Sequence, residues 1–330
     1  MNIVCATDNN FVQHCAVTLI SILKNNSNDI NIYILTEGLS EDNESKLKQL
    51  VTKNGGQIHI ILVNSDILKD CPMPKMSVLD HISMATYYRL LISKLLPENI
   101  DKVIYFDCDI VVRHNLDDLW NYSVTGNAIA AVYQISKSNI DEANRLGYPS
   151  SYGYFNAGVL LINLKYWRDH HISERLFEFL NLNKEKIIYH DQDVLNGMLY
   201  DKCTKLPIKW NMLTYFFMKK ILNINDVING EIINSYADYK NQILNIKGDP
   251  SVIHFVYKPK PWDAACDHPY KNIYFQYLRY TPWKEFKAPK VFLTSLNHPQ
   301  IFYIWFKEKI KRIFIGNPYL PIRTEKIRTQ

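Results

Sequence analysis

Two aspartates that follow a very apolar segment are the first residues in this chain that could do chemistry. Asp107 and Asp109 come directly after residues 103–106, which we predict to be a buried strand. In extended backbone, side chains at positions i and i+2 point to the same side. Two carboxylates held together repel each other unless a cation neutralises them. Because oxygen ligands suit hard divalent ions such as magnesium or manganese, this pair is a candidate metal site.

Two enzyme classes place such an acid pair after an apolar strand. In nucleotide-sugar transferases, a metal bridges the diphosphate and stabilises it as a leaving group. In haloacid-dehalogenase-type phosphatases, the pattern Asp-x-Asp-x-Val supplies a nucleophile and an acid, and residues 107–111 fit it. That pattern is expected near the N-terminus, with a later Ser or Thr, a Lys and a second acid pair that this sequence does not place. No G-x-G-x-x-G follows the first predicted strand, which disfavours a dinucleotide-binding dehydrogenase.

Other polar residues stand in contexts that permit both a functional and a structural interpretation. Arg89 lies in an otherwise apolar predicted helix, where a lone arginine often extends to the surface. Asp191 and Asp193 stand at a predicted helix N-terminus, where they could simply complement the helix dipole. His254 follows two apolar residues and could be a core histidine. Added to the aspartate pair, however, it completes a set of two oxygen donors and one imidazole, which fits manganese.

The elements that must position these residues alternate between strand-like and helix-like patterns over the first 165 residues. The predicted strands cover residues 3–6, 32–35, 58–63, 103–106, 128–132 and 159–162, and the predicted helices cover 11–23, 41–54 and 85–96. Continuous apolar strands separated by helices indicate an α/β fold with a mostly parallel sheet and helices on both faces. Ligands of such sheets bind beyond the carboxyl ends of the strands. Residues 212–245 show no clear period.

The net charge of +5 is concentrated at the C-terminal end of the chain. Residues 306–330 hold seven basic and two acidic side chains, so the preceding residues are balanced. A nucleic-acid binder usually presents a basic working face, and we therefore expect no nucleic-acid partner. Residues 302–314 have apolar side chains on one helical face and basic ones beside it, a pattern suited to an anionic membrane surface. The alternative is a C-terminal helix that packs on the body.

The sequence also carries signals about the compartment. No charged leader followed by an apolar stretch opens the chain, and no apolar run approaches the roughly 18 residues of a spanning helix. The six cysteines form no C-x-x-C pair, so we expect free thiols. These features predict a cytoplasmic protein, associated peripherally with the inner face of the cytoplasmic membrane through its tail.

Six separated blocks of the sequence resemble the family 8 retaining glycosyltransferases, most closely the bacterial lipooligosaccharide and lipopolysaccharide galactosyl- and glucosyltransferases. The blocks are residues 3–10, 81–90, 107–109, 154–163, 191–197 and 254–262. The resemblance implies a GT-A type fold with a Rossmann-like, mostly parallel sheet. It places a glycosyltransferase domain at residues 1–262 and an aromatic and basic membrane-association segment, with a helical tail, at residues 263–330.

The activity implied by the resemblance is that of a retaining UDP-hexose transferase. It would move galactose or glucose from a UDP-sugar to a glycan acceptor of a bacterial surface glycolipid, with Mn²⁺, or alternatively Mg²⁺, assisting the departure of UDP. The alternatives kept beside it are the Asp-x-Asp phosphatase and a catalytically inactive relative that binds UDP or carbohydrate.

The resemblance also assigns roles to individual residues. The implied metal ligands are Asp107, Asp109 and His254. The other residues implied in donor binding are Ala6, Asp8, Asn10, Arg89, Cys108, Asn156, Ala157, Asp191, Gln192, Tyr257 and Lys260. The catalytic candidates are Gln192, beneath the anomeric carbon, with Asp191, Asp193 and Arg89. Residues 72–81 correspond to a loop that folds over the donor, and His81 and Thr86 are expected near the acceptor.

Two further expectations concern a departure from the family and the reaction path. The family usually has glycine three residues after the histidine, where this chain has Tyr257. A backbone contact to the diphosphate survives there if the loop needs no positive φ. Gln192 is a poor nucleophile and Asp193 would have to swing in, so we expect a front-face reaction. In it the leaving oxygen takes the proton of the acceptor, and electrostatic stabilisation supplies most of the rate.

Overall fold

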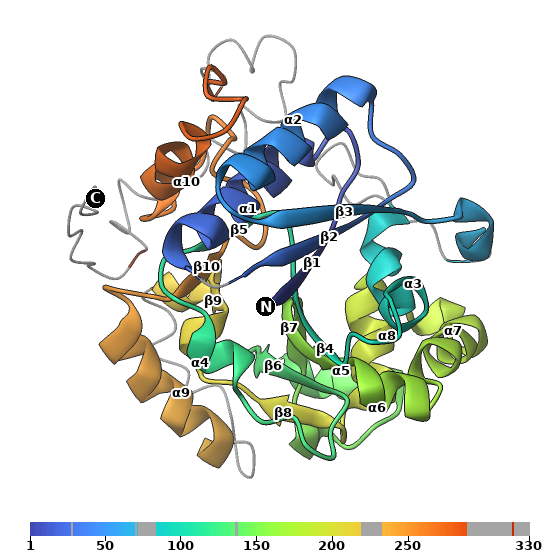
Figure 1. Ribbon diagram of the computed structural model, residues 1–330. Coiled ribbons are helices and arrows are strands. Elements are labelled where there is room, and N and C mark those ends of the chain that lie inside the picture. The colour runs from blue at the N-terminus through green and yellow to red at the C-terminus, as the bar shows by residue number, and fades with distance from the viewer. Residues whose placement is uncertain are drawn as a thin grey trace, which may run out of the picture.

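The computed structural model describes residues 1–27, 29–69, 71, 84–135, 138–218, 233–288 and 319. In this part of the chain the strands form a seven-stranded sheet, in the order β3-β2-β1-β4-β7-β6-β8, and a three-stranded sheet, in the order β5-β10-β9. In Figure 1 the smaller sheet lies to the left of the middle strands of the larger one, β1 and β7.

The larger sheet confirms the predicted α/β fold with a mostly parallel sheet. Its strands are β1 (Asn2–Ala6), β2 (Asn31–Thr36), β3 (Gln57–Leu62), β4 (Lys102–Phe106), β6 (Ile129–Tyr133), β7 (Phe155–Asn163) and β8 (Cys203–Lys205). Strands β1 to β4 are parallel to one another, and β8 is parallel to β6. Only β7 runs against its neighbours β4 and β6 among these strands. Its eight buried residues explain why its sequence reads as one continuous apolar run.

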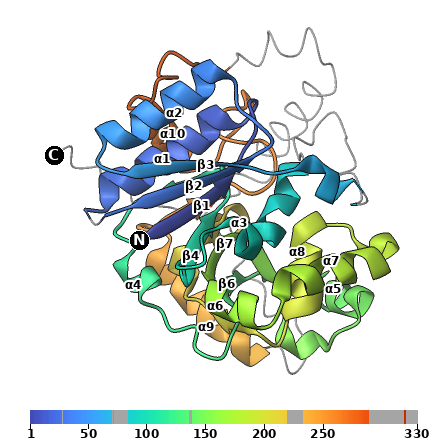
Figure 2. The same cartoon turned by 45° about the vertical axis from the view of Figure 1, so that its right-hand side comes forward.

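Helices cover both faces of the sheet, as the alternating pattern predicts. Figures 1 and 2 show α1 (Val12–Asn25) and α2 (Glu41–Lys53) on one side of β1 to β3, with α3 (Ile92–Leu95), α7 (Ile172–Leu182) and α8 (His190–Leu199) on the other. Helix α2 begins where expected, because the Ser40 hydroxyl accepts a hydrogen bond from the backbone N–H of Asn43. The chain leaves α2 through Gly55, whose φ of +82° favours glycine.

The segment predicted as one helix over residues 85–96 differs in the structure. It consists of a 3₁₀ helix, η2 (Met84–Leu91), followed by the single turn of α3. Residues 85 and 87–91 are all buried, so most of η2 packs against the body. Tertiary packing, and not amphipathic period, therefore sets its helix type.

The remaining elements complete the body. They are α4 (Asp117–Trp120), α5 (Ser138–Leu146), α6 (Leu164–Asp169), α9 (Ile233–Ile246) and α10 (Lys271–Leu278), with β5 (Ile110–Val112), β9 (Met212–Leu213) and β10 (Val252–His254). Short 3₁₀ turns are η1 (Ser65–Leu68), η3 (Ser150–Tyr152), η4 (Lys184–Lys186), η5 (Ile208–Trp210) and η6 (Thr214–Phe217). Helix α9 falls in the segment without a clear sequence period.

The chain beyond residue 262 continues to pack on the body. Asn25 Nδ2 of α1 donates to the Tyr277 hydroxyl of α10 at 2.7 Å, and the His14 ring lies 2.7 Å from the Tyr274 hydroxyl. Tyr319 forms an isolated bridge with Met218. The predicted amphipathic helix at residues 302–314 lies outside the described residues. Among the described helices, none has the length and apolar character needed to cross a membrane.

Candidate active site

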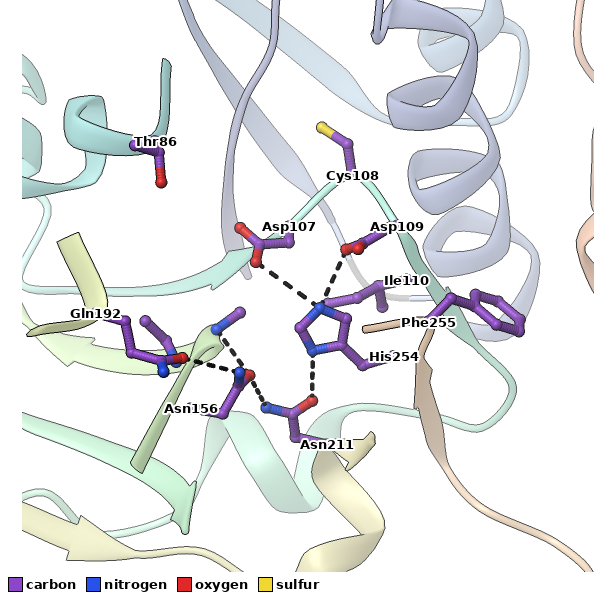
Figure 3. Close-up of polar contacts among 12 residues, drawn as sticks. Thr86, Asp107, Cys108, Asp109, Ile110, Asn156, Gln192, Asn211, His254 and Phe255 are labelled. Atoms are coloured by element: carbon purple, nitrogen blue, oxygen red, sulfur yellow. Dashed lines mark hydrogen bonds and ion pairs between the residues drawn. The ribbon is translucent and has the colours of Figure 1, made fainter. Parts of the chain in front are cut away.

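The two aspartates lie in the turn that connects β4 to β5. Strand β4 ends at Phe106, and the backbone turns at Cys108 and Asp109 before β5 begins. We predicted extended backbone at this pair from the i, i+2 spacing, and the turn shows that this prediction is wrong. The side chains nevertheless converge, because the turn directs both of them toward His254 (Figure 3). His254 Nε2 lies 3.1 Å from Asp109 Oδ1 and 3.8 Å from Asp107 Oδ2.

Strand pairing brings the histidine to the aspartates. His254 ends β10 and pairs with Ile110, the first residue of β5. The backbone of Gly158 in β7 passes directly against this pair. A Cβ atom at position 158 would lie 2.2 Å from His254 Cε1 and 2.7 Å from Asp107 Oδ2. Only glycine leaves room for the ring and the carboxylate at this place.

The donor atoms gathered here fit a divalent cation. One ligand atom each of Asp107, Asp109 and His254 lies within 4.8 Å of the others. Asp109 Oδ1 is buried and accepts no hydrogen bond among the described residues. Two carboxylates and an imidazole that point at a common position, with a buried oxygen lacking a hydrogen-bond donor, match the preferences of manganese or magnesium.

Arg89 connects the aspartate turn to the helix that carries the catalytic candidates. Its side chain is 6 % exposed, so it is not a snorkelling surface residue. Its guanidinium is 2.7 Å from Asp107 Oδ1 and 2.9 Å from Asp191 Oδ2, and it donates to the Ala157 carbonyl. It also stacks over the Tyr105 ring, with 4.3 Å to the centroid. The fixed charge of arginine suits this shared position between two carboxylates.

Burial and neighbouring charges shift the pKa values of Asp191 and Asp109 in opposite directions. Burial raises the pKa of Asp191 to about 6, although the Arg89 charge and a hydrogen bond from the Thr86 hydroxyl oppose it. Burial also acts to raise the pKa of Asp109, but Lys260 and His254 outweigh it and hold that pKa well below its usual range. Thr86, which we expect near the acceptor, therefore also contacts Asp191.

Gln192 lies in the first turn of α8 and faces β7. Its Oε1 accepts hydrogen bonds from Asn156 Nδ2 at 2.9 Å and from the backbone N–H of Ala157 at 3.1 Å. His190, two residues earlier, has a left-handed φ of +51°. Helix α8 thus begins with strained backbone at His190, and the Gln192 amide two residues later is held by two hydrogen bonds. Backbone strain of this kind is typical of functional sites.

Asp193 is fully buried and has donors around both of its oxygens. Both terminal nitrogens of Arg145 lie 2.9 Å from its carboxylate, and the Tyr154 hydroxyl lies at 2.7 Å. The backbone N–H groups of Ile188 and Tyr189 also donate to it, each at 2.7 Å. To reach a substrate, Asp193 would have to break these five hydrogen bonds. The arrangement is that of a residue that holds the turn before α8 in place.

The loop after β10 carries the predicted diphosphate residues. Lys260 Nζ lies 2.6 Å from Asp109 Oδ2 and donates to the Phe255 carbonyl. Tyr257 has a φ of +63°, and its side chain is exposed. The loop therefore does require the left-handed backbone that a glycine would adopt without strain. Trp262 closes the loop by stacking on His14 of α1, with ring centroids 3.5 Å apart.

The residues predicted to meet the nucleotide lie at the carboxyl end of β1. Asp8 Oδ1 accepts from the backbone N–H groups of Asn10 and Phe11, at 2.8 and 3.0 Å, and so closes the turn into α1. The Cys108 thiol donates to the Ala6 carbonyl at 3.2 Å. This contact fastens the first strand to the aspartate turn. His81 and the predicted loop at residues 72–81 lie outside the described residues.

One residue of the site escaped the sequence analysis. Asn211 is fully buried just before β9, with its Oδ1 3.0 Å from His254 Nδ1 and its Nδ2 2.8 Å from Asn156 Oδ1. The available signal was a polar residue between Trp210 and Met212, both of which are buried. Figure 3 shows how this amide connects the histidine to the asparagine of β7.

Known proteins resemble the chain along most of its length. General stress protein A of Bacillus subtilis (strain 168) is 28% identical over 296 residues, which cover 88% of this chain and 97% of that protein. Lipopolysaccharide glucosyltransferase WaaO of Escherichia coli (strain K12) is 30% identical over 291 residues, 86% of this chain and 79% of that protein.

A solved structure agrees with the fold. Galactosyltransferase LgtC, in complex with donor and acceptor sugar analogs, superimposes with a TM-score of 0.75 and 27% identity, covering 86% of this chain and 96% of that one. This match confirms the predicted GT-A type fold. The sequence also matches the family described as Glycosyl transferase family 8 over residues 2–266. This match favours glycosyl transfer over the phosphatase interpretation. The chain therefore belongs to glycosyl transferase family 8.

Proposed function

We propose that the chain is a retaining transferase that moves galactose or glucose from a UDP-sugar to a glycan acceptor of a bacterial surface glycolipid. The observation that carries the proposal is the cluster of Asp107, Asp109 and His254, which Arg89 connects to Asp191. The names of the relatives, which include lipopolysaccharide glucosyl- and galactosyltransferases, support the class of donor and acceptor.

The cluster would hold Mn²⁺, with Mg²⁺ as the alternative ion. When bound, the cation supplies positive charge that stabilises the departing diphosphate. Lys260 lies 2.6 Å from Asp109, and its flexible ammonium can turn to the same diphosphate as a point charge. Ala6, Asp8 and Asn10, at the end of β1, would receive the uridine.

The residues around the sugar would act by position and charge. Arg89 and Asp191 form a buried ion pair that can accept hydrogen bonds from, and donate them to, sugar hydroxyls. Gln192 is fixed by two donors beneath the position we assign to the anomeric carbon. Because Asp193 is held by five hydrogen bonds, we favour the front-face path. In it the acceptor proton passes to the leaving phosphate oxygen.

Slow hydrolysis of a UDP-hexose without acceptor is the expected signature of this activity. Purified protein, screened with UDP-galactose, UDP-glucose and their N-acetylated analogues, should release UDP from one of them in Mn²⁺ and lose that activity in a chelator. The measurement is UDP release, coupled to detection of the free sugar. Full activity in chelator would overturn the metal assignment. Release of phosphate from simple phosphomonoesters, without UDP-sugar turnover, would instead support the phosphatase alternative. Binding of UDP without turnover on candidate acceptors would support the alternative of an inactive relative.

We also propose that residues 263–330 associate with an anionic membrane surface, which would place the enzyme on the inner face of the cytoplasmic membrane. The support is the excess of five positive charges within residues 306–330 and the amphipathic pattern of residues 302–314. Residues 1–262 would then form the catalytic domain.

Neutralising the last three basic residues should weaken membrane binding. Each basic residue near an anionic surface contributes about 1 kcal/mol, so Arg323→Gln, Lys326→Gln and Arg328→Gln together should lower partitioning on the order of 100-fold. The measurement is co-sedimentation with vesicles containing phosphatidylglycerol. The matched control replaces three exposed lysines of the body, Lys94, Lys165 and Lys202, by glutamine. Equal partitioning of both triple variants would contradict the proposal.

A further inference from the structure

We propose that Asn211 is a positioning residue that fixes the His254 ring for metal binding and links it, through Asn156, to Gln192. The three amides and the imidazole form one continuous hydrogen-bonded chain, which we call the amide relay (Figure 3). The inference rests on the proposed function, because it takes His254 Nε2 as a ligand of a divalent cation.

Backbone groups set the direction of the amide relay. The N–H of Gly158 donates to Asn156 Oδ1 at 3.0 Å, and the N–H of Ala157 donates to Gln192 Oε1 at 3.1 Å. A backbone N–H can only donate, so each of these contacts identifies the oxygen end of a side-chain amide. The orientations of Asn156 and Gln192 thus follow from the chain path of β7 and need no assumption about the amides themselves.

The orientation of Asn156 determines that of Asn211. Asn156 Oδ1 is an acceptor, so the Asn211 atom 2.8 Å from it must be the Nδ2 amide nitrogen. The Oδ1 of Asn211 therefore faces His254 Nδ1, at 3.0 Å. An oxygen at that distance requires a hydrogen on Nδ1. In the neutral imidazole, which is the form that binds a metal ion, the lone pair is then on Nε2, the nitrogen that faces Asp107 and Asp109.

The other end of the amide relay reaches a catalytic candidate. Asn156 Nδ2 donates to Gln192 Oε1 at 2.9 Å. Asn211, Asn156 and His254 are all buried, so none of them can replace a lost partner with bulk water. Rotation of one amide would place two acceptors or two donors face to face at the next contact. The relay therefore resists any change in the orientation of either the metal ligand or the glutamine.

The hydrogen bonds of Asn211 to His254 and Asn156 explain why this position holds an asparagine, whereas packing does not. Its neighbours Trp210 and Met212 are buried apolar residues. A leucine of similar size would satisfy the packing, but it would leave His254 Nδ1 without its acceptor and Asn156 Oδ1 with the Gly158 N–H as its remaining donor. The outer partner of a metal-binding histidine typically changes metal affinity by 10- to 100-fold when it is removed.

Two variants test the contacts of Asn211 with His254 and with Asn156 separately. Asn211→Leu removes both contacts, and Mn²⁺ affinity, measured by electron paramagnetic resonance with saturating UDP, should fall about 10- to 100-fold. Asn211→Asp keeps an oxygen toward His254 but faces Asn156 with a second acceptor. It should retain Mn²⁺ affinity within about threefold of the wild type while kcat falls at least about tenfold. In parallel, ¹⁵N chemical shifts of His254 without metal should show the Nδ1–H form in the wild type and its loss in Asn211→Leu.

Asn26→Leu is the matched control. Asn26 is also a buried amide with two partners, since its Nδ2 donates to the Ile22 carbonyl and its Oδ1 accepts from the Leu116 N–H, but it lies at the end of α1 away from the site. It should lower the melting temperature and leave Mn²⁺ affinity and the His254 spectrum unchanged.

The outcomes distinguish this inference from the proposed function. Wild-type Mn²⁺ affinity in Asn211→Leu, or an equal loss in Asn26→Leu, would overturn the role of Asn211. An unaltered ¹⁵N spectrum in Asn211→Leu would overturn it as well. A wild-type chain that binds no Mn²⁺ with UDP would instead count against the proposed function, and the spectra would still decide on the relay.

Discussion

Asp109→Asn should lower UDP-sugar turnover on the order of 10³-fold. The substitution removes one negative charge and one of the two carboxylates that would hold the cation. A cation at a departing diphosphate contributes several kcal/mol of stabilisation, and roughly 4 kcal/mol corresponds to about 10³-fold in rate. The change should act through the site and not through folding, because removing the repulsion between Asp107 and Asp109 offsets the loss of the ion pair between Lys260 and Asp109.

The assay is kcat/KM for UDP release, with Mn²⁺ affinity and melting temperature measured on the same samples. Asp249→Asn is the matched control, because Asp249 also pairs with a cation and a histidine, Arg113 and His114, but is exposed. An exposed pair contributes at most about 1 kcal/mol, so this control should keep full turnover. Turnover within tenfold of the wild type in Asp109→Asn would contradict the metal site.

Gly158→Ala should reduce turnover by more than about 100-fold through a single added methyl group. The new Cβ would lie 2.2 Å from His254 Cε1 and 2.7 Å from Asp107 Oδ2, far inside van der Waals contact. The ring and the carboxylate must move apart, and they are the groups assigned to the cation. Overpacking of this kind typically costs about 1–3 kcal/mol of stability, so the protein should still fold.

Gly248→Ala provides the control for this substitution. A Cβ at Gly248 meets nothing within 4 Å, and the backbone there is compatible with alanine. This variant should retain the activity and Mn²⁺ affinity of the wild type, whereas Gly158→Ala should lose both. Normal Mn²⁺ binding by Gly158→Ala would show that the contact between β7 and His254 is not as tight as the structure indicates.

Much of the fold could be predicted from the sequence because the signals are local. The apolar run of β7 and the start of α2 at Ser40 depend on neighbouring residues, and both were predicted within a few positions. The gathering of Asp107, Asp109 and His254 was inferred from donor chemistry and family resemblance. Their route to one another is a turn and an antiparallel strand pair, and no local pattern indicates either.

Other parts of the site depend on contacts between distant residues, which a single sequence does not reveal. Asn211 stands directly before the segment without a clear period, and its partners come from β7 and β10. The resemblance suggested Asp193 as a catalytic candidate, whereas its five hydrogen bonds come from residues 145–189. Residues 85–96 were predicted as one helix because nothing in the local sequence shows the tertiary packing around residues 84–91, which form a 3₁₀ helix.

The pairing of β10 between β5 and β9 has a consequence for the order in which this enzyme matures. During synthesis, the turn that carries Asp107 and Asp109 and the strand that carries Gly158 emerge well before residues 252–254. A nascent chain that has completed β7 therefore possesses both carboxylates but lacks the imidazole. Only when β10 inserts along β5 does the ring arrive, together with the loop that carries Lys260. Donor binding, as we propose it, thus requires residues that are synthesised after every strand of the large sheet.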